Sequence, residues 1–110
     1  NKREHWLLAA IRQAPGRRES LVELAQYYYE SQSWKNCLEY AKRSLEVKEK
    51  PLDYLCEEFA WGYLPWDLAA ISAYYLGDKE NALIYGKNAL ELEPENERLI
   101  ANMAYYEQKD

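Results

Sequence analysis

Apolar residues recur every three or four positions in two neighbouring stretches, the spacing typical of helices with one buried face. A Gly77-Asp78 pair separates the stretches, with Gly77 a left-handed stop for the first helix and Asp78 an N-cap for the second. The pattern predicts an antiparallel helical hairpin whose small residues let the two backbones approach closely. Its apolar positions are Trp66, Ala69, Ala70, Ala73 and Leu76, then Ala82, Leu83, Gly86, Ala89 and Leu90.

The same arrangement occurs once upstream. Tyr28 and Cys37 are separated by the same interval as Ala73 and Ala82, and Ser33 takes the place of Asp78. A second hairpin is therefore predicted, with apolar or small positions at Leu21, Leu24, Ala25, Tyr28, Cys37, Ala41 and Ser44.

These residues resemble the tetratricopeptide repeat, whose pattern is W-x2-L-G-x2-Y…A-x3-F…P with a period of about 34 residues. The downstream copy keeps Trp66, three small sites and Pro94, but has Ala73 for the usual Tyr. The upstream copy keeps Tyr28, but has Leu21 for Trp and Cys37 for Ala. The resemblance implies an all-α fold, a tetratricopeptide-like solenoid of helical hairpins.

The chain divides into five blocks within one domain of 110 residues. A helix over 2–14 turns Trp6, Leu7, Ala10 and Ile11 inward and is either half of an incomplete repeat or a cap. Repeats are expected over 18–48 and 65–94, and the helix after Trp34 is expected to turn Trp34, Cys37, Leu38, Ala41 and Leu45 inward. A helix over 96–108 caps the end, with Leu99, Ile100, Met103 and Ala104 inward and Glu97, Arg98, Asn102 and Gln108 outward.

The two copies are displaced by 45 residues instead of 34, because about eleven residues are inserted between them. This insertion, 51–64, predicts a short extra helix over about 52–60, which brings the expected total to about seven helices. Its large side chains either fill the gap between repeats or form an exposed binding patch. The Arg17-Arg18 pair is read either as a solvated turn or salt bridge, or as an anion or partner contact.

The insertion and its flanks also resemble the repeat segment that follows the catalytic domain in some bacterial and phage family 2 glycosyltransferases. The resemblance spans about Trp6 to Tyr106 and rests on runs such as Pro15-Gly16-Arg17-Arg18-Glu19, Trp34-x2-Cys37-Leu38-x-Tyr40-Ala41, and Lys50-Pro51-x2-Tyr54-x-Cys56-Glu57-x-Phe59-Ala60-Trp61-Gly62-x2-Pro65. It implies a parent enzyme whose separate α/β domain moves a sugar from a nucleotide donor, using a metal held by an Asp-x-Asp motif. This chain has no such motif, so the resemblance implies a non-catalytic accessory module without a cofactor.

Charge and cysteine content limit the classes of partner and the cellular location that we expect. The net charge of −5 offers no electrostatic case for nucleic acid or an anionic membrane. Two cysteines, Cys37 and Cys56, lack metal-ligand spacing, and no signal peptide or membrane-length apolar run is present, so a cytoplasmic location is expected. The chain begins at Asn1, which suggests a fragment or processed product.

The sequence contains no set of residues spaced for acid-base or nucleophilic catalysis. His5 is the single histidine, and Glu57 and Glu58 are adjacent, so on a helix they point about 100 degrees apart. Cys37 takes a small inward-facing position, where a buried thiol is expected.

Eleven tyrosines suit a surface that is part core and part contact site. In stacked hairpins the first helix of each pair lines the concave side, and this rule selects ten candidate groove residues: Gln26, Tyr29, Glu30, Asp67, Ile71, Tyr74, Tyr75, Arg98, Asn102 and Tyr105. Either the tyrosines fill the groove by packing together, or the groove is open and recognises a peptide.

Three functions remain open at this point. The first is an interaction module that binds a protein, a peptide or the catalytic domain of its own polypeptide. The second is part of an enzyme, in which these helices position an acceptor substrate; a groove acidic on balance argues against direct binding of an anionic sugar nucleotide. The third is a homodimerisation unit.

Overall fold

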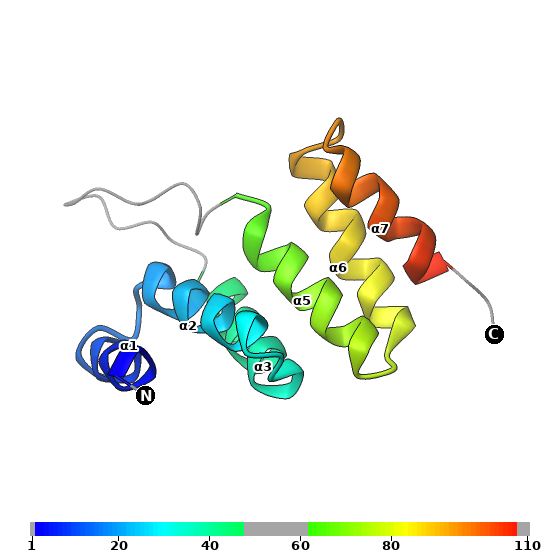
Figure 1. The fold of residues 1–110 in the computed structure, drawn as a ribbon. Helices are drawn as coiled ribbons and strands as arrows, with labels where there is room; N and C mark the ends of the chain where they lie inside the picture. The colour runs from blue at the N-terminus through cyan, green and yellow to red at the C-terminus, as the bar shows by residue number, and fades with distance from the viewer. Residues whose placement is uncertain (1, 48–61, 108–110) are drawn as a thin grey trace.

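The computed structural model describes residues 2–47 and 62–107 (Figure 1). Over these residues the chain forms six helices and no strand, which confirms the all-helical prediction. The helix expected over 52–60, Cys56 and Gln108 lie outside the described residues. The helices are α1 (Lys2–Gln13), α2 (Arg18–Glu30), α3 (Trp34–Leu45), α5 (Leu64–Tyr75), α6 (Lys79–Leu92) and α7 (Glu97–Glu107).

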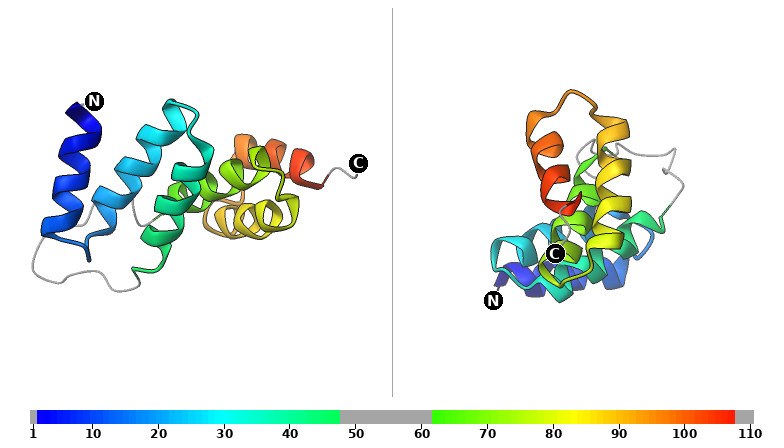
Figure 2. Two further views of the ribbon diagram at one scale, coloured as in Figure 1. Left: turned by 90° about the horizontal axis from the view of Figure 1, so that it is seen from below. Right: turned by 90° about the vertical axis from the view of Figure 1, so that its right-hand side faces the viewer.

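Each helix packs against the next one along the described chain, and α2 also contacts α5 (Figures 1 and 2). The helices α1 and α7 therefore lie at opposite ends of a molecule that measures 43 × 30 × 20 Å. Figure 2 shows α6 and α7 side by side at one end.

The turns after α2 and α5 have the same backbone structure. Ser33 N–H donates to the Tyr28 carbonyl and Asp78 N–H to the Ala73 carbonyl, each at 2.8 Å. The residue before each donor has a positive φ, 60° at Gln32 and 88° at Gly77. These features describe one helix-ending motif used twice, 45 residues apart, and confirm the predicted role of Gly77.

Side-chain caps begin two of the helices. The Asp78 carboxylate accepts from the backbone N–H of Asn81 at 3.2 Å, as predicted. At the start of α7, the Asn96 side-chain oxygen accepts from the backbone N–H groups of Arg98 and Leu99. Ser33, which stands in the position of Asp78, makes no such side-chain bond.

Most of the predicted inward positions of the hairpins are buried. Leu21, Leu24, Ala25, Tyr28, Cys37 and Ala41 form one cluster with Leu68 and Ala69, and Ala70, Ala73, Ala82, Met103 and Tyr106 form a second. Trp66 is half-buried against the first cluster, while Ala82 belongs to the second. Leu38 and Tyr85 border both clusters, so the core is continuous between the hairpins.

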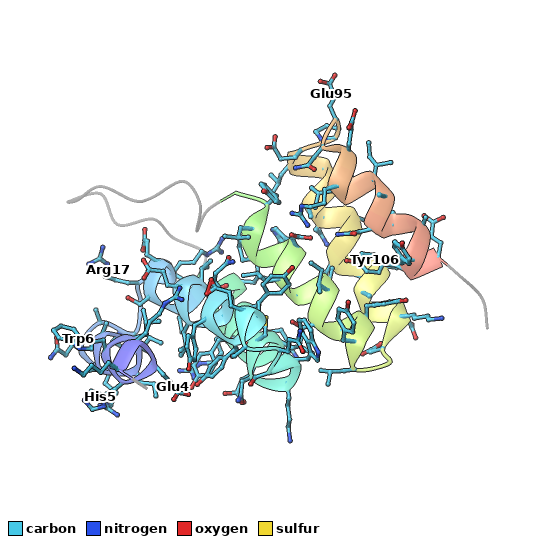
Figure 3. The ribbon with its side chains drawn as sticks, viewed as in Figure 1. Glu4, His5, Trp6, Arg17, Glu95 and Tyr106 are labelled. Carbon is cyan, nitrogen blue, oxygen red and sulfur yellow. The ribbon has the colours of Figure 1, made fainter. Side chains whose placement is uncertain are left out.

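The prediction for the first helix is wrong at Trp6, whose side chain is 74% exposed. The face of α1 that meets α2 is centred on Leu7 and Ile11, and Tyr28 of α2 donates a hydrogen bond to Glu4 at 2.6 Å. Trp6 immediately precedes Leu7, lies about 100° from it around the helix, and projects away from α2 (Figure 3).

The last helix is also rotated relative to its prediction. Leu99 and Met103 are buried as expected, but Ile100 is 50% exposed and Ala104 is exposed. Tyr106 completes the buried face, because Met103 and Tyr106 pack in the second cluster with residues of α5 and α6, and Leu99 is buried as well.

Leu38, Leu83 and Leu90 are half-buried at positions predicted to face inward, and Leu76 and Trp34 depart further from the prediction. Leu76 is 48% exposed, because it lies in the turn beyond the last residue of α5. Trp34 is half-buried at the first position of α3, where its ring lies over Tyr75 instead of entering the core.

The two arginines of the Arg17-Arg18 pair differ: Arg18 is buried, whereas Arg17 is partly exposed and close to a carboxylate, as the salt-bridge reading expected. Arg18 is 8% exposed and donates from Nη2 to the Val47 carbonyl at 2.5 Å, which joins the start of α2 to the segment just after α3. Arg17 lies 4.0 Å from the buried Glu19 carboxylate.

Candidate functional site

A groove of about 740 Å³ crosses one face of the molecule. Its walls come from the C-terminal halves of α2 and α5, from the first residue of α3, and from α7. We call it the aromatic groove, and its lining residues are Tyr29, Glu30, Gln32, Trp34, Ile71, Tyr74, Tyr75, Arg98, Asn102, Tyr105 and Tyr106.

The repeated architecture explains why tyrosines meet here. Tyr29 follows the buried Tyr28 on α2, and Tyr74 follows the buried Ala73 on α5, so each lies one position beyond the packed face of its helix. Because α2 and α5 are in contact, these equivalent positions lie on the same side of the molecule.

The rings along the groove form a continuous series. Trp34 stacks on Tyr75 with ring centroids 4.3 Å apart and planes 11° from parallel. Tyr29 meets Trp34 edge-on at 5.8 Å, and Tyr74 lies 5.6 Å from Tyr75. Tyr74 continues the series to α7, with centroids 6.4 Å from Tyr105 and 5.7 Å from Tyr106. Aromatic contacts therefore join four helices.

The tyrosines do not close the groove by packing together. Tyr75 is 59% exposed and Tyr105 is 54% exposed, although each contacts other rings. Of the two alternatives left by the sequence, filled or open, the structure has an open groove with aromatic walls.

An ion pair between the exposed Arg98 and the buried Asp67 links α5 to α7 beside the groove. Arg98 Nη2 donates to Asp67 Oδ2 at 2.6 Å, and Asp67 is 4% exposed. Burial raises the pKa of the Asp67 carboxyl, and the hydrogen bond from Arg98 offsets only part of this effect. The same bond raises the pKa of Arg98. The pair fixes the guanidinium on the groove wall.

The Tyr106 hydroxyl is a polar group without a hydrogen bond among the described residues. Tyr106 is 4% exposed and its oxygen is buried, yet its side chain lines the groove. Burial, and then the nearby Asp67 carboxylate, raise the pKa of the phenol, so the hydroxyl keeps its proton and can donate it. Figure 3 shows Tyr106 in the last turns of α7.

The charge of the lining is balanced, which corrects the expected acidic groove. Its two charged residues are Glu30 and Arg98. Glu30 accepts from Arg3 at 2.7 Å, and Arg98 is paired with Asp67. Asp67 does not contribute charge to the lining, because its carboxylate is buried behind Arg98.

Eight of the ten predicted groove residues line this one groove. Gln26 and Asp67 are the two that do not line it. Gln26 is half-buried elsewhere, and the Asp67 carboxylate accepts a hydrogen bond from Arg98 behind the groove wall. The prediction omitted Gln32, Trp34 and Tyr106, which also line it. The equivalence of Gln32 with Gly77 could have placed Gln32 at the turn, but the rotation of α7 that brings Tyr106 into the groove leaves no signal in the sequence pattern.

Other chemistry in the described part of the chain is limited. The thiol of Cys37 is fully buried, and burial raises its pKa to about 11, as expected for a packing residue. His5 is exposed on α1. Among residues 2–47 and 62–107, no cluster of three or more His, Cys, Asp or Glu side chains could hold a metal ion.

No described helix has the length and apolar character needed to cross a membrane.

Comparison of the sequence with protein-family models and with curated proteins finds no match.

Proposed function

We propose that this chain is a non-catalytic interaction module whose aromatic groove binds an extended segment of a protein. The partner is a peptide of another protein, or a segment of the catalytic domain in the same polypeptide. The observation that carries the proposal is the open groove itself, where exposed Tyr75 and Tyr105 rings lie beside the planar polar groups of Arg98 and Asn102. Tyr, Trp and Arg dominate the binding energy of protein interfaces.

We also propose that the helices form a tetratricopeptide-like solenoid. Two features support it: the identical turns after α2 and α5, and the burial of equivalent small residues in both hairpins, such as Cys37 with Ala82 and Ala41 with Gly86. In a stack of this kind, first helices form a shared concave surface. The groove is lined mainly by α2, α5 and α7, which are the first helices in this proposal.

The resemblance to the repeat segment of family 2 glycosyltransferases supports an accessory role in such an enzyme, with a cytoplasmic location. Within that proposal the chain itself performs no turnover and needs no cofactor. A pull-down that uses the catalytic domain as bait tests this assignment directly. Retention by the wild-type module, with loss on Tyr105→Ala, supports a contact through the groove; no retention overturns the domain-to-domain form of the proposal.

A random twelve-residue peptide library tests peptide binding without any assumption about the parent. Sequences enriched on the immobilised wild-type module are expected to lose binding to Tyr105→Ala, which removes an exposed groove ring. The control variant is Ile84→Ala, because Ile84 is similarly exposed, 50% against 54%, but lies on α6 outside the groove. Equal retention by Tyr105→Ala and wild type, or no enrichment, would refute groove binding.

Positioning of a carbohydrate acceptor is the second candidate function. The specific observation in its favour is the row of exposed tyrosine rings, which offer flat surfaces to the apolar faces of sugars. Titration with a neutral oligosaccharide and with nucleotide sugars separates this candidate from the first. Micromolar binding that Tyr74→Ala abolishes would replace the interaction-module proposal.

A further inference from the structure

The connections before α2 and before α7 have the same backbone structure. Each is four residues long, over 14–17 and 93–96, and has a proline at its second position. In both, the N–H of the last residue donates to the carbonyl of the first, at 3.1 Å after α1 and 3.2 Å after α6. In both, the N–H of the first residue continues the hydrogen bonding of the preceding helix, at 3.0 Å and 3.1 Å. Helix α1 therefore corresponds to α6, and α7 corresponds to α2.

Helices α1 and α7 each lack one of the neighbours that their counterparts have. The pairs α2·α3 and α5·α6 are hairpins, and α3 and α6 also pack on the next described helix along the chain. Helix α1 packs on α2 and α7 packs on α6, but within residues 2–47 and 62–107 neither has a hairpin partner. Figures 1 and 2 show α1 and α7 at opposite ends of the molecule. One end thus has the second helix of an incomplete hairpin, and the other end has the first helix of one.

The exposed apolar residues of α7 occupy positions that are buried where a hairpin partner is present. Ile100 corresponds to Leu21, 79 residues earlier, and Ala104 corresponds in the same way to Ala25. Leu21 is 2% exposed and Ala25 is fully buried, whereas Ile100 is 50% exposed and Ala104 is exposed. A terminal helix that only caps a solenoid presents a polar outer face. The outer face of α7 instead matches the packing face of a first helix.

Trp6 is the matching exposed residue at the other end. It corresponds to Tyr40 and Tyr85, which lie 34 and 79 residues later. Tyr85 packs on Trp66 of its hairpin partner α5, with ring centroids 6.3 Å apart, and Trp66 corresponds to Ile100 of α7. Trp6 is 74% exposed and points away from α2 (Figure 3). When α1 pairs with an α7, Trp6 meets Ile100 as Tyr85 meets Trp66.

Opposite charges occur at equivalent points of the two ends. Arg3 takes the position of Ala82, and Glu107 takes the position of Ala73. Ala73 and Ala82 are fully buried in one cluster, so these two positions come together when a hairpin forms. Arg3 pairs with Glu30 of its own chain at 2.7 Å, yet its side chain is still 50% exposed, and Glu107 is exposed. Helix α1 carries three basic residues and one acidic residue, whereas α7 carries two acidic residues and one basic residue.

We propose that copies of this chain associate end to end, with α7 of one copy and α1 of the next forming the hairpin that each end lacks. Trp6 of one copy packs on Ile100 and Ala104 of its neighbour, and Arg3 faces Glu107. The contact joins two different surfaces, so each added copy leaves a free α1 and a free α7, and the assembly does not close at a dimer. The inference rests on the proposed solenoid architecture and is independent of the aromatic groove.

Pairing of identical ends fits less well. Two antiparallel α7 helices place Glu97 opposite Glu107, and two antiparallel α1 helices place Lys2 opposite Arg12. Like charges that face each other across an interface oppose association. The charges therefore favour α1 against α7.

Sedimentation equilibrium of the whole 110-residue chain tests the inference. A single helix pair is a small interface, so the association is expected to be weak and is followed from about 10 μM to about 1 mM. The weight-average mass should rise with concentration and pass that of a dimer without a plateau.

Two variants each block one end. Trp6→Glu and Ile100→Glu place a carboxylate in the contact, and each variant alone should associate at least about 10-fold more weakly than wild type. An equimolar mixture of the two should form a dimer and stop there, because that dimer uses the intact α7 of the first variant and the intact α1 of the second. Ile84→Glu is the control and should associate like wild type, because Ile84 is also 50% exposed but lies on α6, between α5 and α7. Both blocking positions are exposed, so circular dichroism should show stabilities within about 0.5 kcal/mol of wild type; if either variant unfolds, Trp6→Ala and Ile100→Ala replace the pair.

A wild-type chain that stays monomeric over this range would overturn the inference. Dimerisation of Trp6→Glu alone would overturn it by showing that α7 pairs with itself, and dimerisation of Ile100→Glu alone would show the same for α1. Equal weakening by Ile84→Glu would place the contact away from the two ends. These outcomes leave the proposed peptide binding to its own test with the library, because neither Trp6 nor Ile100 lines the aromatic groove.

Discussion

Helix α7 lies close against α6 at Gly86. A methyl group added there would lie 2.7 Å from Met103 Sδ and 3.0 Å from two ring carbons of Tyr106. Such contacts are too short, so Gly86→Ala must displace α7 or its side chains. The same displacement would move Tyr106 at the groove.

The expected magnitude combines two opposing effects. Alanine is favoured over glycine inside a helix by about 1 kcal/mol, whereas overpacking a core costs about 1–3 kcal/mol. The Met103 sulfur can move, because its side chain is flexible, but the Tyr106 ring is stiff and packed. We therefore expect Gly86→Ala to lower the free energy of unfolding by about 1 kcal/mol, equivalent to about 4–8 °C in Tm for a domain of this size.

Urea and thermal denaturation followed by circular dichroism measure the change. Gly16→Ala is the matched control, because nothing lies within 4 Å of a methyl group there, and its stability should stay within about 0.5 kcal/mol of wild type. Adding Met103→Ala to Gly86→Ala should recover part of the loss relative to the sum of the single variants, with a coupling of at least about 0.5 kcal/mol.

A gain in stability for Gly86→Ala, close to the full helix-propensity advantage, would refute this reasoning. So would additivity of Gly86→Ala with Met103→Ala. Either outcome would mean that α7 does not pack on α6 at this distance, and that Tyr106 is not held at the groove as described.

Four further predictions concern single side chains. Arg98→Met leaves the Asp67 carboxylate buried without its cation and should lower the free energy of unfolding at pH 7 by about 2 kcal/mol in urea denaturation; an unchanged midpoint would contradict the ion pair. Because burial raises the pKa of Asp67 above 3.8, its contribution to stability should be present below pH 3.8 and fall as pH rises through the folded-state pKa, and Asp67→Asn should abolish this dependence. Hydrogen bonds from Asn81 lower the pKa of Asp78, so its cap should stabilise the protein above pH 3.8 and be lost as pH falls through the folded-state pKa, with Asp78→Ala insensitive over that range. The buried Cys37 thiol should resist iodoacetamide at pH 8 until urea unfolds the protein, as read by mass spectrometry of its peptide; rapid native alkylation would disprove its burial.

Local sequence signals were sufficient for much of this protein. Gly77 and Asp78 act within a single turn, and their backbone geometry and hydrogen bonds follow from residue type alone. The spacing of small residues likewise predicted that Ala25, Ala41, Ala73 and Ala89 are buried, because each element is a helix with one packed face. These features determine the six helices of residues 2–47 and 62–107, and the similarity of the two hairpins, without reference to any distant residue.

The groove was predictable only in part. Tyr29, Tyr74 and Tyr105 were identified because they lie one position beyond a packed face. Asp67 occupies a comparable position on its helix, yet it is buried, because Arg98 lies 31 residues away in sequence and within hydrogen-bond distance in space. No pattern along a single helix contains that information.

Tertiary structure alone decided how α1 and α7 are rotated about their axes and where the Trp34 ring lies. Neighbouring residues on a helix differ by about 100°, so a small rotation exchanges which of them meets the core. Ile100 and Tyr106 were both available to face α6, and the space opposite Gly86 accommodates the Tyr106 ring. The sequence thus determined which segments are helical and where they turn, whereas the crossing of those helices determined that Trp6 faces solvent and that Trp34 and Tyr106 complete the aromatic groove.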